Sequence, residues 1–420
     1  AAVRRRLAWR PVAPRPLAPL AYATPSGPKF GEAQRCLAEW QSVLSWAACV
    51  VPALEEDGPP VEEQVRAMAQ RAFSELRTAC FLDVTYLELE GEPRPIFGLG
   101  ASEEDFVARY CGRGGCVRSL LAYCEDGQRV QLFEGRLEGR VVEPRGEGPL
   151  HDAWDRVWLP EGYPGTLAEL EASAFVLSAR HVPFLELARA LRAWDYSQIF
   201  EVHVTVEAPG GRPEPLESFQ EACRGLRGDF GPVKPVVIQN SSGEAARQMM
   251  TASYHVGTLP EVHRLAFRLA QALVRAGFRV LRAKIEANMS NRGVPESDAE
   301  AAQHSPENYF EFHVKLRLPP GFEEERLRSA AAATGARVSR SALRVDGAGV
   351  QRRFVTQRCY GVGRASALRC FERCCAALQA SGFAIESKIR EYAVYDSNVR
   401  LDRGWIEAPG GAKWEAQAAG

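Results

Sequence analysis

An internal duplication in the second half of the chain constrains the fold more than any other feature of the sequence. Residues 199–206 read IFEVHVTV and match residues 309–316, which read YFEFHVKL. Residues 254–257 and 360–363 match as well, and each is followed by a long amphipathic pattern that ends at a Gly-Phe pair. Glycine is the residue most often found just past a helix C-terminus. A spacing near 110 residues indicates two tandem domains rather than a solenoid of short units.

Each copy follows the same predicted order of elements: strand, helix, strand, strand, helix, strand. The last strand of both copies carries a Lys-Ile pair. This order predicts two tandem ferredoxin-like α+β repeats, each an antiparallel sheet with its helices on one face. The repeats are assigned to 199–289 and 309–406, with a polar linker at 290–308 and a tail at 407–420.

Four side chains of the first strands are candidate functional residues. Because strand side chains alternate, Glu201 and His203 share one face, as do Glu311 and His313 in the second repeat. Helices cover the apolar face of such a sheet, so these four residues are expected on its open face or where the repeats meet. A stabilising contact between the repeats is the favoured interpretation.

Other interpretations of the same residues stay open beside it. The four side chains are of types that ligate metals, and an open sheet face can bind RNA through exposed aromatic residues, which these strands do not clearly show. His203-Val-Thr205 resembles half of the motif of two-histidine phosphoesterases, but the second copy reads His313-Val-Lys315 and breaks the required pair. Residues 199–406 match no family that we recognise, and small-molecule binding by this half is a further hypothesis.

The near-zero net charge of the chain hides a basic arm. The 420 residues contain 52 Lys+Arg and 53 Asp+Glu, a balance that argues against a protein that works mainly by coating nucleic acid. Residues 1–31 hold six basic and no acidic residues, so 46 basic and 53 acidic residues remain in 32–420. The Pro/Arg-rich arm at 1–21 is typical of the remnant of a mitochondrial or plastid targeting segment, or of a segment that binds a partner.

The cysteine pattern does not indicate disulfides. The chain has eleven cysteines, an odd number, and shows no secretory signal, so we expect reduced thiols in an intracellular compartment. Cys370, Cys374 and Cys375 lie at helical spacing without a neighbouring histidine. This spacing favours packing on a helix over zinc binding.

The first part of the chain predicts an α/β domain over 22–192. An apolar pattern with a spacing of three to four residues predicts a helix over 30–49, and alternation of β-rich residues predicts a strand over 80–89. Residues 119–123 and 131–142 are expected to pair as the strands of a hairpin around a Glu-Asp-Gly turn. Helices and strands therefore alternate along this part of the chain.

Four short motifs of this domain carry a family resemblance. They are QLFEGRLEGRVVEPRG at 131–146, AWD at 153–155, PEGY at 160–163 and TLAE at 166–169. In this order they resemble the inosine triphosphate pyrophosphatase family. The resemblance implies an α/β pyrophosphatase-like fold and, in the family, Mg²⁺-dependent hydrolysis of non-standard purine nucleoside triphosphates to monophosphates. That chemistry requires carboxylates to hold Mg²⁺ and basic or amide groups to bind the phosphates.

The resemblance also implies which residues would bind a nucleotide. Thr24 and Lys29 match the family's phosphate-binding turn, and Glu55 matches its first metal-binding glutamate. The positions that persist, and that could retain nucleotide binding, are Thr24, Lys29, Glu55, Trp154, Asp155, Ser178 and Arg180. Trp154 and Asp155 also have a plain interpretation as packing and capping residues.

Several positions that carry the family's chemistry are changed. Val84 replaces the metal-binding aspartate, and Asp83 replaces the glutamate before it. Because strand side chains alternate, Asp83 points to the opposite face from Val84 and cannot take over its role. The degenerate positions are Ser26, Asp83, Val84, Ala174 and Ala179, where the family has asparagine, glutamate, aspartate, lysine and histidine. We expect a pseudoenzyme with no catalytic residues, no metal and no cofactor, with Mg²⁺ only if the site were active.

These observations predict a non-catalytic accessory or scaffold subunit of a large organellar complex. A mitochondrial respiratory-chain assembly or a mitochondrial ribosome fits, and nucleic acid is expected nearby only in the ribosomal case. The arm and the tail are expected to bind neighbouring subunits. Two alternatives stay open: an active pyrophosphatase for non-standard purine nucleotides, and a regulator that binds a small molecule in the duplicated half.

Overall fold

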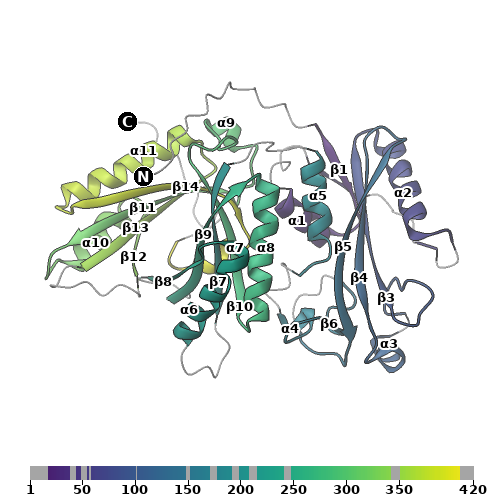
Figure 1. Ribbon diagram of the computed structural model, residues 1–420. Coiled ribbons are helices and arrows are strands. Elements are labelled where there is room, and N and C mark those ends of the chain that lie inside the picture. Colours follow the sequence, from purple (N-terminus) through teal and green to yellow (C-terminus); the bar gives the residue numbers. More distant parts are fainter. Residues whose placement is uncertain are drawn as a thin grey trace.

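The chain folds into a six-stranded sheet and a separate closed barrel of eight strands (Figure 1). The computed structural model describes residues 18–37, 44–48, 54–55, 58–100, 102–147, 152–170, 177–191, 198–207, 215–240, 247–341 and 351–406. Most of the N-terminal arm and the tail at 407–420 therefore lie outside the described residues. No helix in the described ranges is long and apolar enough to cross a membrane.

The six-stranded sheet belongs to the predicted α/β domain. Its strands are β1 (Leu20–Ala23), β2 (Leu44–Ala47), β3 (Cys80–Leu89), β4 (Gly114–Cys124), β5 (Val130–Val141) and β6 (Trp158–Pro160). They lie in the order β2-β1-β3-β4-β5-β6, with β1 parallel to both neighbours and the other pairs antiparallel. The helices are α1 (Gly27–Cys36), α2 (Val61–Leu76), α3 (Glu103–Tyr110), α4 (Leu167–Leu170) and α5 (His181–Ala190).

The two faces of this sheet pack in different hydrophobic cores. In β1, Tyr22 belongs to the core that also contains residues of α1 and α5, whereas Ala21 packs with α2 in a second core. The same alternation in β3 assigns Phe81 to the first core and Leu82 to the second. Because side chains alternate along a strand, each polar residue of β3 faces either the α1 and α5 side or the α2 side of the sheet.

The prediction of one helix over 30–49 is wrong. Helix α1 ends at Cys36, and its C-cap Leu37 has a non-helical backbone with φ −106° and ψ 41°. Residues 44–47 form β2, which pairs in parallel with β1.

The predicted hairpin is present as β4 and β5, which pair in register from Gly114 with Arg140 to Cys124 with Val130.

The second half contains the duplicated elements. The first copy comprises β7 (Gln198–Glu207), α6 (Pro215–Gly225), the short α7 (Arg227–Phe230), β8 (Lys234–Asn240), β9 (Arg247–Gly257), α8 (Leu259–Arg275) and β10 (Arg279–Asn288). The second comprises β11 (Tyr309–Leu318), α10 (Glu324–Ala332), β12 (Arg337–Ser341), β13 (Gln351–Tyr360), α11 (Arg364–Ala380) and β14 (Ile385–Asp396). A short α9 (Asp298–Ala301) lies between the copies, and the 3-10 turn η4 (Val399–Asp402) follows β14.

The two copies do not form independent open sheets. Strand β10 pairs with β14, and β8 pairs with β12, so the order β10-β14-β11-β13-β12-β8-β9-β7 closes on itself. The open sheet face that the sequence suggested is therefore the inside of one barrel. Closure also removes the edge strands that two separate sheets would expose.

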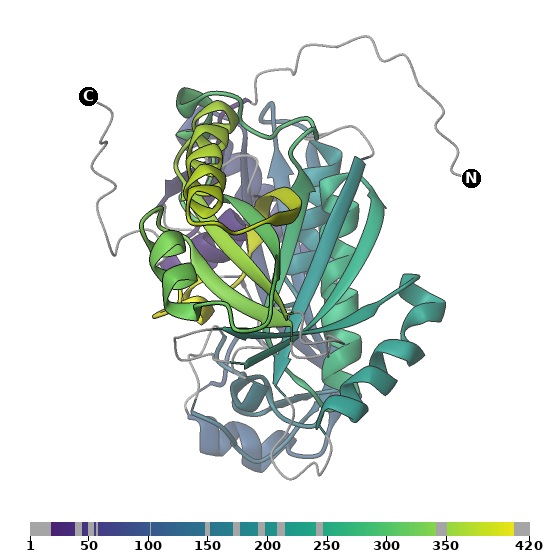
Figure 2. The ribbon, with the colours of Figure 1, turned by 90° about the vertical axis from the view of Figure 1, so that its left-hand side faces the viewer.

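The long helices cover the outside of the barrel. Helix α8 packs on β7 and β10, and α11 packs on β11 and β13 on the other side (Figure 2). Phe200, Val202 and Val204 of β7 belong to the same core as apolar residues of α8. The alternate side chains of β7 must then point into the barrel.

Helix α5 of the first domain lies against α8 of the barrel (Figure 1). The imidazole of His181 stacks on the ring of Phe267 with a centroid distance of 4.6 Å. Glu186 of α5 forms an ion pair with Arg264 of α8. Through this contact the α/β domain and the barrel form one continuous hydrophobic core.

Candidate functional site

The turn between β1 and α1 builds the site to which the family resemblance points. Ser26 is the N-cap of α1, and its hydroxyl accepts the backbone N–H of Lys29 at 3.4 Å. The buried Thr24 hydroxyl accepts the N–H of Ser26 at 3.2 Å. This capped turn directs the Lys29 side chain across to β3, where its ammonium lies 3.1 Å from Asp83.

Asp83 is held by groups of the protein itself. Its carboxylate accepts hydrogen bonds from Lys29 and from the hydroxyl of Tyr22, and its side chain is 1% exposed. Burial alone would raise the pKa of Asp83, but the positive charges of Lys29 and Arg180 and the hydrogen bond from Tyr22 lower it below the usual range. Asp83 is therefore a buried anion with internal partners.

Arg180 is the centre of a second internal network. Its guanidinium donates to Glu32 at 2.8 Å and to Asp152 at 2.7 Å, and the side chain is 2% exposed. The other oxygen of Glu32 lies 3.0 Å from the ring of His181. Burial would raise the pKa of Glu32, but Arg180 and His181 lower it well below its ordinary value. Ser178 accepts the backbone N–H of Arg180 at 3.3 Å.

The described residues do not fit a Mg²⁺ site of the family's kind. Val84 packs against the second core, which Leu54 and Phe97 also contact, so it lies on the α2 side of the sheet. Glu55 follows Leu54 directly and is exposed. The position where the family has its metal-binding aspartate is Val84, which has no carboxylate. Asp83 is engaged on the other face. In the described ranges, no group of three or more His, Cys, Asp or Glu side chains is placed to hold a metal ion.

Other residues of the family motifs contribute to packing or to the shape of a turn. The Trp154 side chain is buried, and its indole N–H has no hydrogen-bond partner among the described residues. Asp155 accepts the backbone N–H of Asp152 at 3.1 Å and so shapes the turn that presents Asp152 to Arg180. Ala179 is buried where the family has histidine. Ala174 lies outside the described residues.

The candidate residues of the duplicated half line the inside of the barrel. The ring of His203 lies 2.9 Å from Glu286 on β10 and 3.6 Å from Glu201. Glu286 pairs with Lys284 at 2.8 Å, and Lys284 also pairs with Glu311 of the second copy. The ion pairs thus cross from one copy to the other.

The same network continues through residues that the sequence analysis missed. Glu311 accepts from Arg358 at 2.7 Å, and Arg358 reaches Asp402 at 2.8 Å. Arg282 pairs with Asp402 at 2.7 Å and with Asp396, which also accepts from Tyr309. The available signal was the alternation of Arg282, Lys284 and Glu286 in a strand whose other face is apolar.

The two histidines differ in their surroundings. Burial would lower the pKa of His203, but its hydrogen bond to Glu286 and the nearby carboxylates raise it above the ordinary value. The pKa of His313 is lowered, because burial outweighs the nearby carboxylates; its ring is 3.0 Å from the hydroxyl of Thr356. The surroundings therefore favour the protonated form of His203 and the neutral form of His313.

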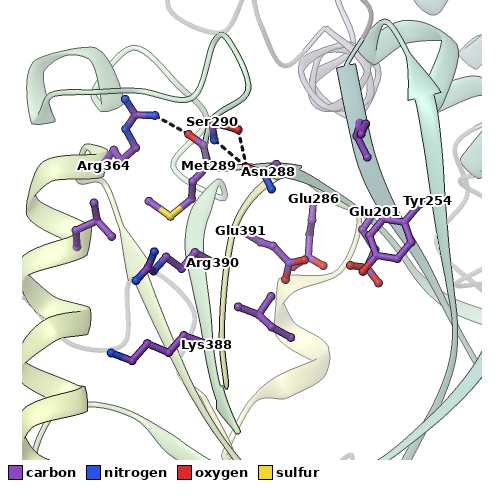
Figure 3. A pocket seen from close by; sticks show the side chains of 13 residues that line it. Glu201, Tyr254, Glu286, Asn288, Met289, Ser290, Arg364, Lys388, Arg390 and Glu391 are labelled. Carbon is purple, nitrogen blue, oxygen red and sulfur yellow. Dashed lines mark hydrogen bonds between the residues drawn. The ribbon is translucent and has the colours of Figure 1, made fainter. Parts of the chain in front are cut away.

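Two cavities flank this network. One, of about 640 Å³, opens at the end of the barrel where Glu201, Glu286 and Glu391 point toward one another, with Arg364 and Arg390 on the opposite side (Figure 3). Burial and the two neighbouring carboxylates raise the pKa of Glu391 to about 10, so its carboxyl is protonated at pH 7. The other cavity, of about 560 Å³, has a charged floor that includes Lys284, and apolar walls formed by Pro235, Val236, Ile238, Met250, Phe354 and Trp405.

Residues 20–183 match the Ham1 family. The inosine triphosphate pyrophosphatase of Batrachochytrium dendrobatidis is 46% identical over 51 residues, which are 12% of this chain and 26% of that protein. The chain therefore spans about a quarter of the length of this relative. The inosine triphosphate pyrophosphatase of Tuber melanosporum is 28% identical over 172 residues, 38% of this chain and 90% of the relative.

Two solved structures are similar to parts of the chain. A HAM1 protein from Coxiella burnetii is similar with a TM-score of 0.36 and 19% identity, over 41% of this chain and 98% of that one. A putative chlorite dismutase, TA0507, is similar with a TM-score of 0.18 and 15% identity, over 47% of this chain and 95% of that one. From the sequence matches, residues 20–183 form a domain of the Ham1 family, to which inosine triphosphate pyrophosphatases belong.

Proposed function

We propose that the protein is a non-catalytic accessory or scaffold subunit of a large mitochondrial complex, in which the Ham1-family domain keeps its fold without its chemistry. One observation carries the proposal: Val84 stands where the family has its metal-binding aspartate, while Asp83 lies on the other face in contact with Tyr22 and Lys29. Valine offers no ligand to Mg²⁺, and among the described residues no group of three or more His, Cys, Asp or Glu side chains is placed to hold a metal ion.

The internal ion pairs support the same proposal. Lys29 and Arg180 occupy positions where the family binds phosphate, yet both are paired with carboxylates of this chain. A nucleotide would have to displace these partners and leave buried carboxylates without cations, which is costly. Retained nucleotide binding is therefore expected to be weak.

An exposed apolar patch on the barrel supports a role in binding proteins. Ile199 of β7 is 55% exposed, and Val256, its pairing partner on β9, is 73% exposed. Tyr254, which pairs with Glu201 two residues along, is 62% exposed. Contiguous exposed apolar side chains are characteristic of interaction surfaces.

We also infer that each copy is a ferredoxin-like unit, because in both copies the strands lie in the sheet in the order second, third, first, fourth.

A hydrolysis assay tests the loss of chemistry. The purified full chain, incubated with Mg²⁺ and inosine triphosphate, should release no pyrophosphate above the buffer control. A catalytically intact member of the family, run in parallel, validates the assay. Turnover by this chain at a rate comparable to that enzyme would overturn the proposal in favour of the active pyrophosphatase.

A substitution at Val84 tests which residue accounts for the loss. Val84→Asp places a carboxylate on the side of Glu55 and should produce Mg²⁺ binding that calorimetry detects. Val84→Asn has nearly the same size without the charge and is the matched control. Equal metal binding by the two variants would show that Val84 is not the missing ligand.

A native gel tests the role as a subunit. Mitochondria solubilised in mild detergent and probed for this chain should show it migrating with a complex in the megadalton range. A tagged soluble matrix enzyme is the control for free migration. If the chain migrates as a free monomer, or is found outside mitochondria, the subunit proposal fails.

A second candidate function is binding of a small molecule inside the barrel. The observation that favours it is the cavity of about 560 Å³ with apolar walls and a charged floor, a combination typical of ligand sites. Met250 lines this cavity, so Met250→Trp should reduce binding of an apolar anionic dye such as anilinonaphthalene sulfonate. Val256→Trp, at an exposed position of the same strand, should not; equal dye binding by both variants would contradict this function.

A further inference from the structure

Two cysteines meet where β13 packs against α11. Cys359 is the second-last residue of β13 and is 5% exposed, and Cys370 lies in the second turn of α11 and is half-buried. The chain reverses between them at Gly361, whose φ of +64° is accessible to glycine without strain. This reversal lays the helix on the strand, and the thiol of Cys359 is a hydrogen-bond partner of Cys370.

Two arginine side chains act on the Cys370 thiol. The guanidinium of Arg373 donates a hydrogen bond to the Cys370 sulfur at 3.2 Å, and the charge of Arg369, one residue before Cys370, adds to the same field. The hydrogen bond from Cys359 and the charge of Arg373 together outweigh burial, so the pKa of Cys370 is lowered below its ordinary value. The thiolate is the nucleophilic form of cysteine.

We propose that Cys370 is a redox-modification site that reacts with hydroperoxides and that Cys359 is its resolving partner. In the first step the Cys370 thiolate attacks hydrogen peroxide: an S–O bond forms, the O–O bond breaks, and hydroxide leaves. In the second step the Cys359 sulfur attacks the sulfenic acid: an S–S bond forms, the S–O bond breaks, and hydroxide leaves with the thiol proton as water. Two thiols and one peroxide thus give one disulfide and two waters.

The contrast with other cysteines of the chain separates this site from packing. Cys223 is fully buried, and burial raises its pKa to about 12, which keeps it in the unreactive thiol form. Cys374, on the same helix as Cys370, is buried as well, and burial raises its pKa. Cys370 differs by its partial exposure and by the arginine that donates a hydrogen bond to its sulfur. The proposed disulfide would link the end of β13 to α11 without depending on the Ham1-family domain.

Peptide mass spectrometry tests the proposal on the full-length, reduced protein. One equivalent of hydrogen peroxide should give a Cys359–Cys370 crosslink that is seen without reductant and lost with it. In Cys359→Ser, the oxidation should stop at a sulfenic acid on Cys370 that dimedone traps. In Cys370→Ser, no crosslink should form and Cys359 should stay reduced. The exposed Cys111 is an internal reference for accessibility, and its reaction ahead of Cys370 would overturn the proposal.

The pH dependence of alkylation gives a second readout that needs no cysteine variant. Iodoacetamide labelling of Cys370 in the wild type should have its midpoint below the value of about 8.5 for an ordinary thiol. Arg373→Gln should move this midpoint upward and slow labelling at pH 7 by several-fold. Arg109→Gln, an exposed arginine of α3 that is distant from the pair, should change neither. A wild-type midpoint at or above 8.5, or equal effects of the two arginine variants, would contradict the assignment.

Discussion

At the residue scale, Asp83 and Arg180 of the Ham1-family domain are each paired with groups of the chain itself. Alternation along β3 predicts that Asp83 and Val84 lie on opposite faces. The structure agrees, because Val84 packs against the second core while Asp83 accepts a hydrogen bond from Tyr22 of the first. The partners of Arg180 could not be predicted in the same way. Glu32 is 148 residues away in sequence and Asp152 is 28, so their meeting depends on the packing of α1 and α5. Local sequence patterns carry no information about such distant pairs.

The Lys29–Asp83 pair yields a stability prediction. Lys29→Met removes the cation from a carboxylate that is 1% exposed, so we expect the free energy of unfolding to fall by about 3 kcal/mol in urea denaturation. The double variant Lys29→Met/Asp83→Asn should regain part of this loss because no buried charge is left unpaired. Arg71→Met, which removes an exposed pair with Glu75 on α2, should cost less than about 0.5 kcal/mol. Equal losses in the two single variants would contradict the buried-charge argument.

The effect of Lys29→Met should also depend on pH. Because the folded pKa of Asp83 is below its ordinary value, its contribution to stability is present above about pH 4 and is lost as the pH falls through the folded pKa. The difference between wild type and variant should therefore be full at pH 7 and shrink in acid. A difference that stays constant from pH 7 to pH 3 would show that lost packing, not charge, causes it.

At the scale of elements, the family motif in β5 has a packing function that its sequence does not reveal. A Cβ atom on Gly135 would lie 1.9 Å from the carbonyl oxygen of Ala179 and 2.7 Å from Pro183. Helix α5 therefore approaches β5 closely only because this position has no side chain. The glycine of this motif therefore serves the packing of the domain, whatever chemistry the domain carries out.

Substitution of Gly135 tests this close approach. Gly135→Ala pushes the methyl group against backbone, so we expect a loss of about 2 kcal/mol or more in the free energy of unfolding. Gly225→Ala is the matched control, because no atom lies within 4 Å of a Cβ added there at the end of α6. It should be neutral or stabilising by up to about 1 kcal/mol. Thermal unfolding compares the two, and a neutral Gly135→Ala would refute the packing argument.

Elements with strong periodicity were predictable, and those defined by tertiary pairing were not. The hairpin of β4 and β5 and the order of elements in each copy follow from the sequence pattern. Strand β2 was predicted as the end of a helix, because Phe30, Leu37 and Leu44 share a helical spacing. Its four residues become a strand through parallel pairing with β1, and only Leu44 among them is buried.

At the scale of the whole molecule, the duplication predicts two similar units but not how they join. Each copy supplies edge strands, and the pairing of β10 with β14 and of β8 with β12 uses all of them. The charged residues inside the barrel then become shared, since Lys284 of the first copy pairs with Glu311 of the second. Two units that share strand pairing and buried ion pairs should unfold together.

Hydrogen exchange on the intact chain can measure this coupling. Arg358 of β13 is 3% exposed and pairs with Glu311 and Asp402, and Asp402 in turn pairs with Arg282 of β10. Arg358→Met leaves both carboxylates with one cation fewer, so protection should fall by a similar free energy in β13 and in β10. The six-stranded sheet is the internal reference and should keep its protection in β4. If β10 keeps its protection while β13 loses it, the two copies are independent units in spite of their closure into one barrel.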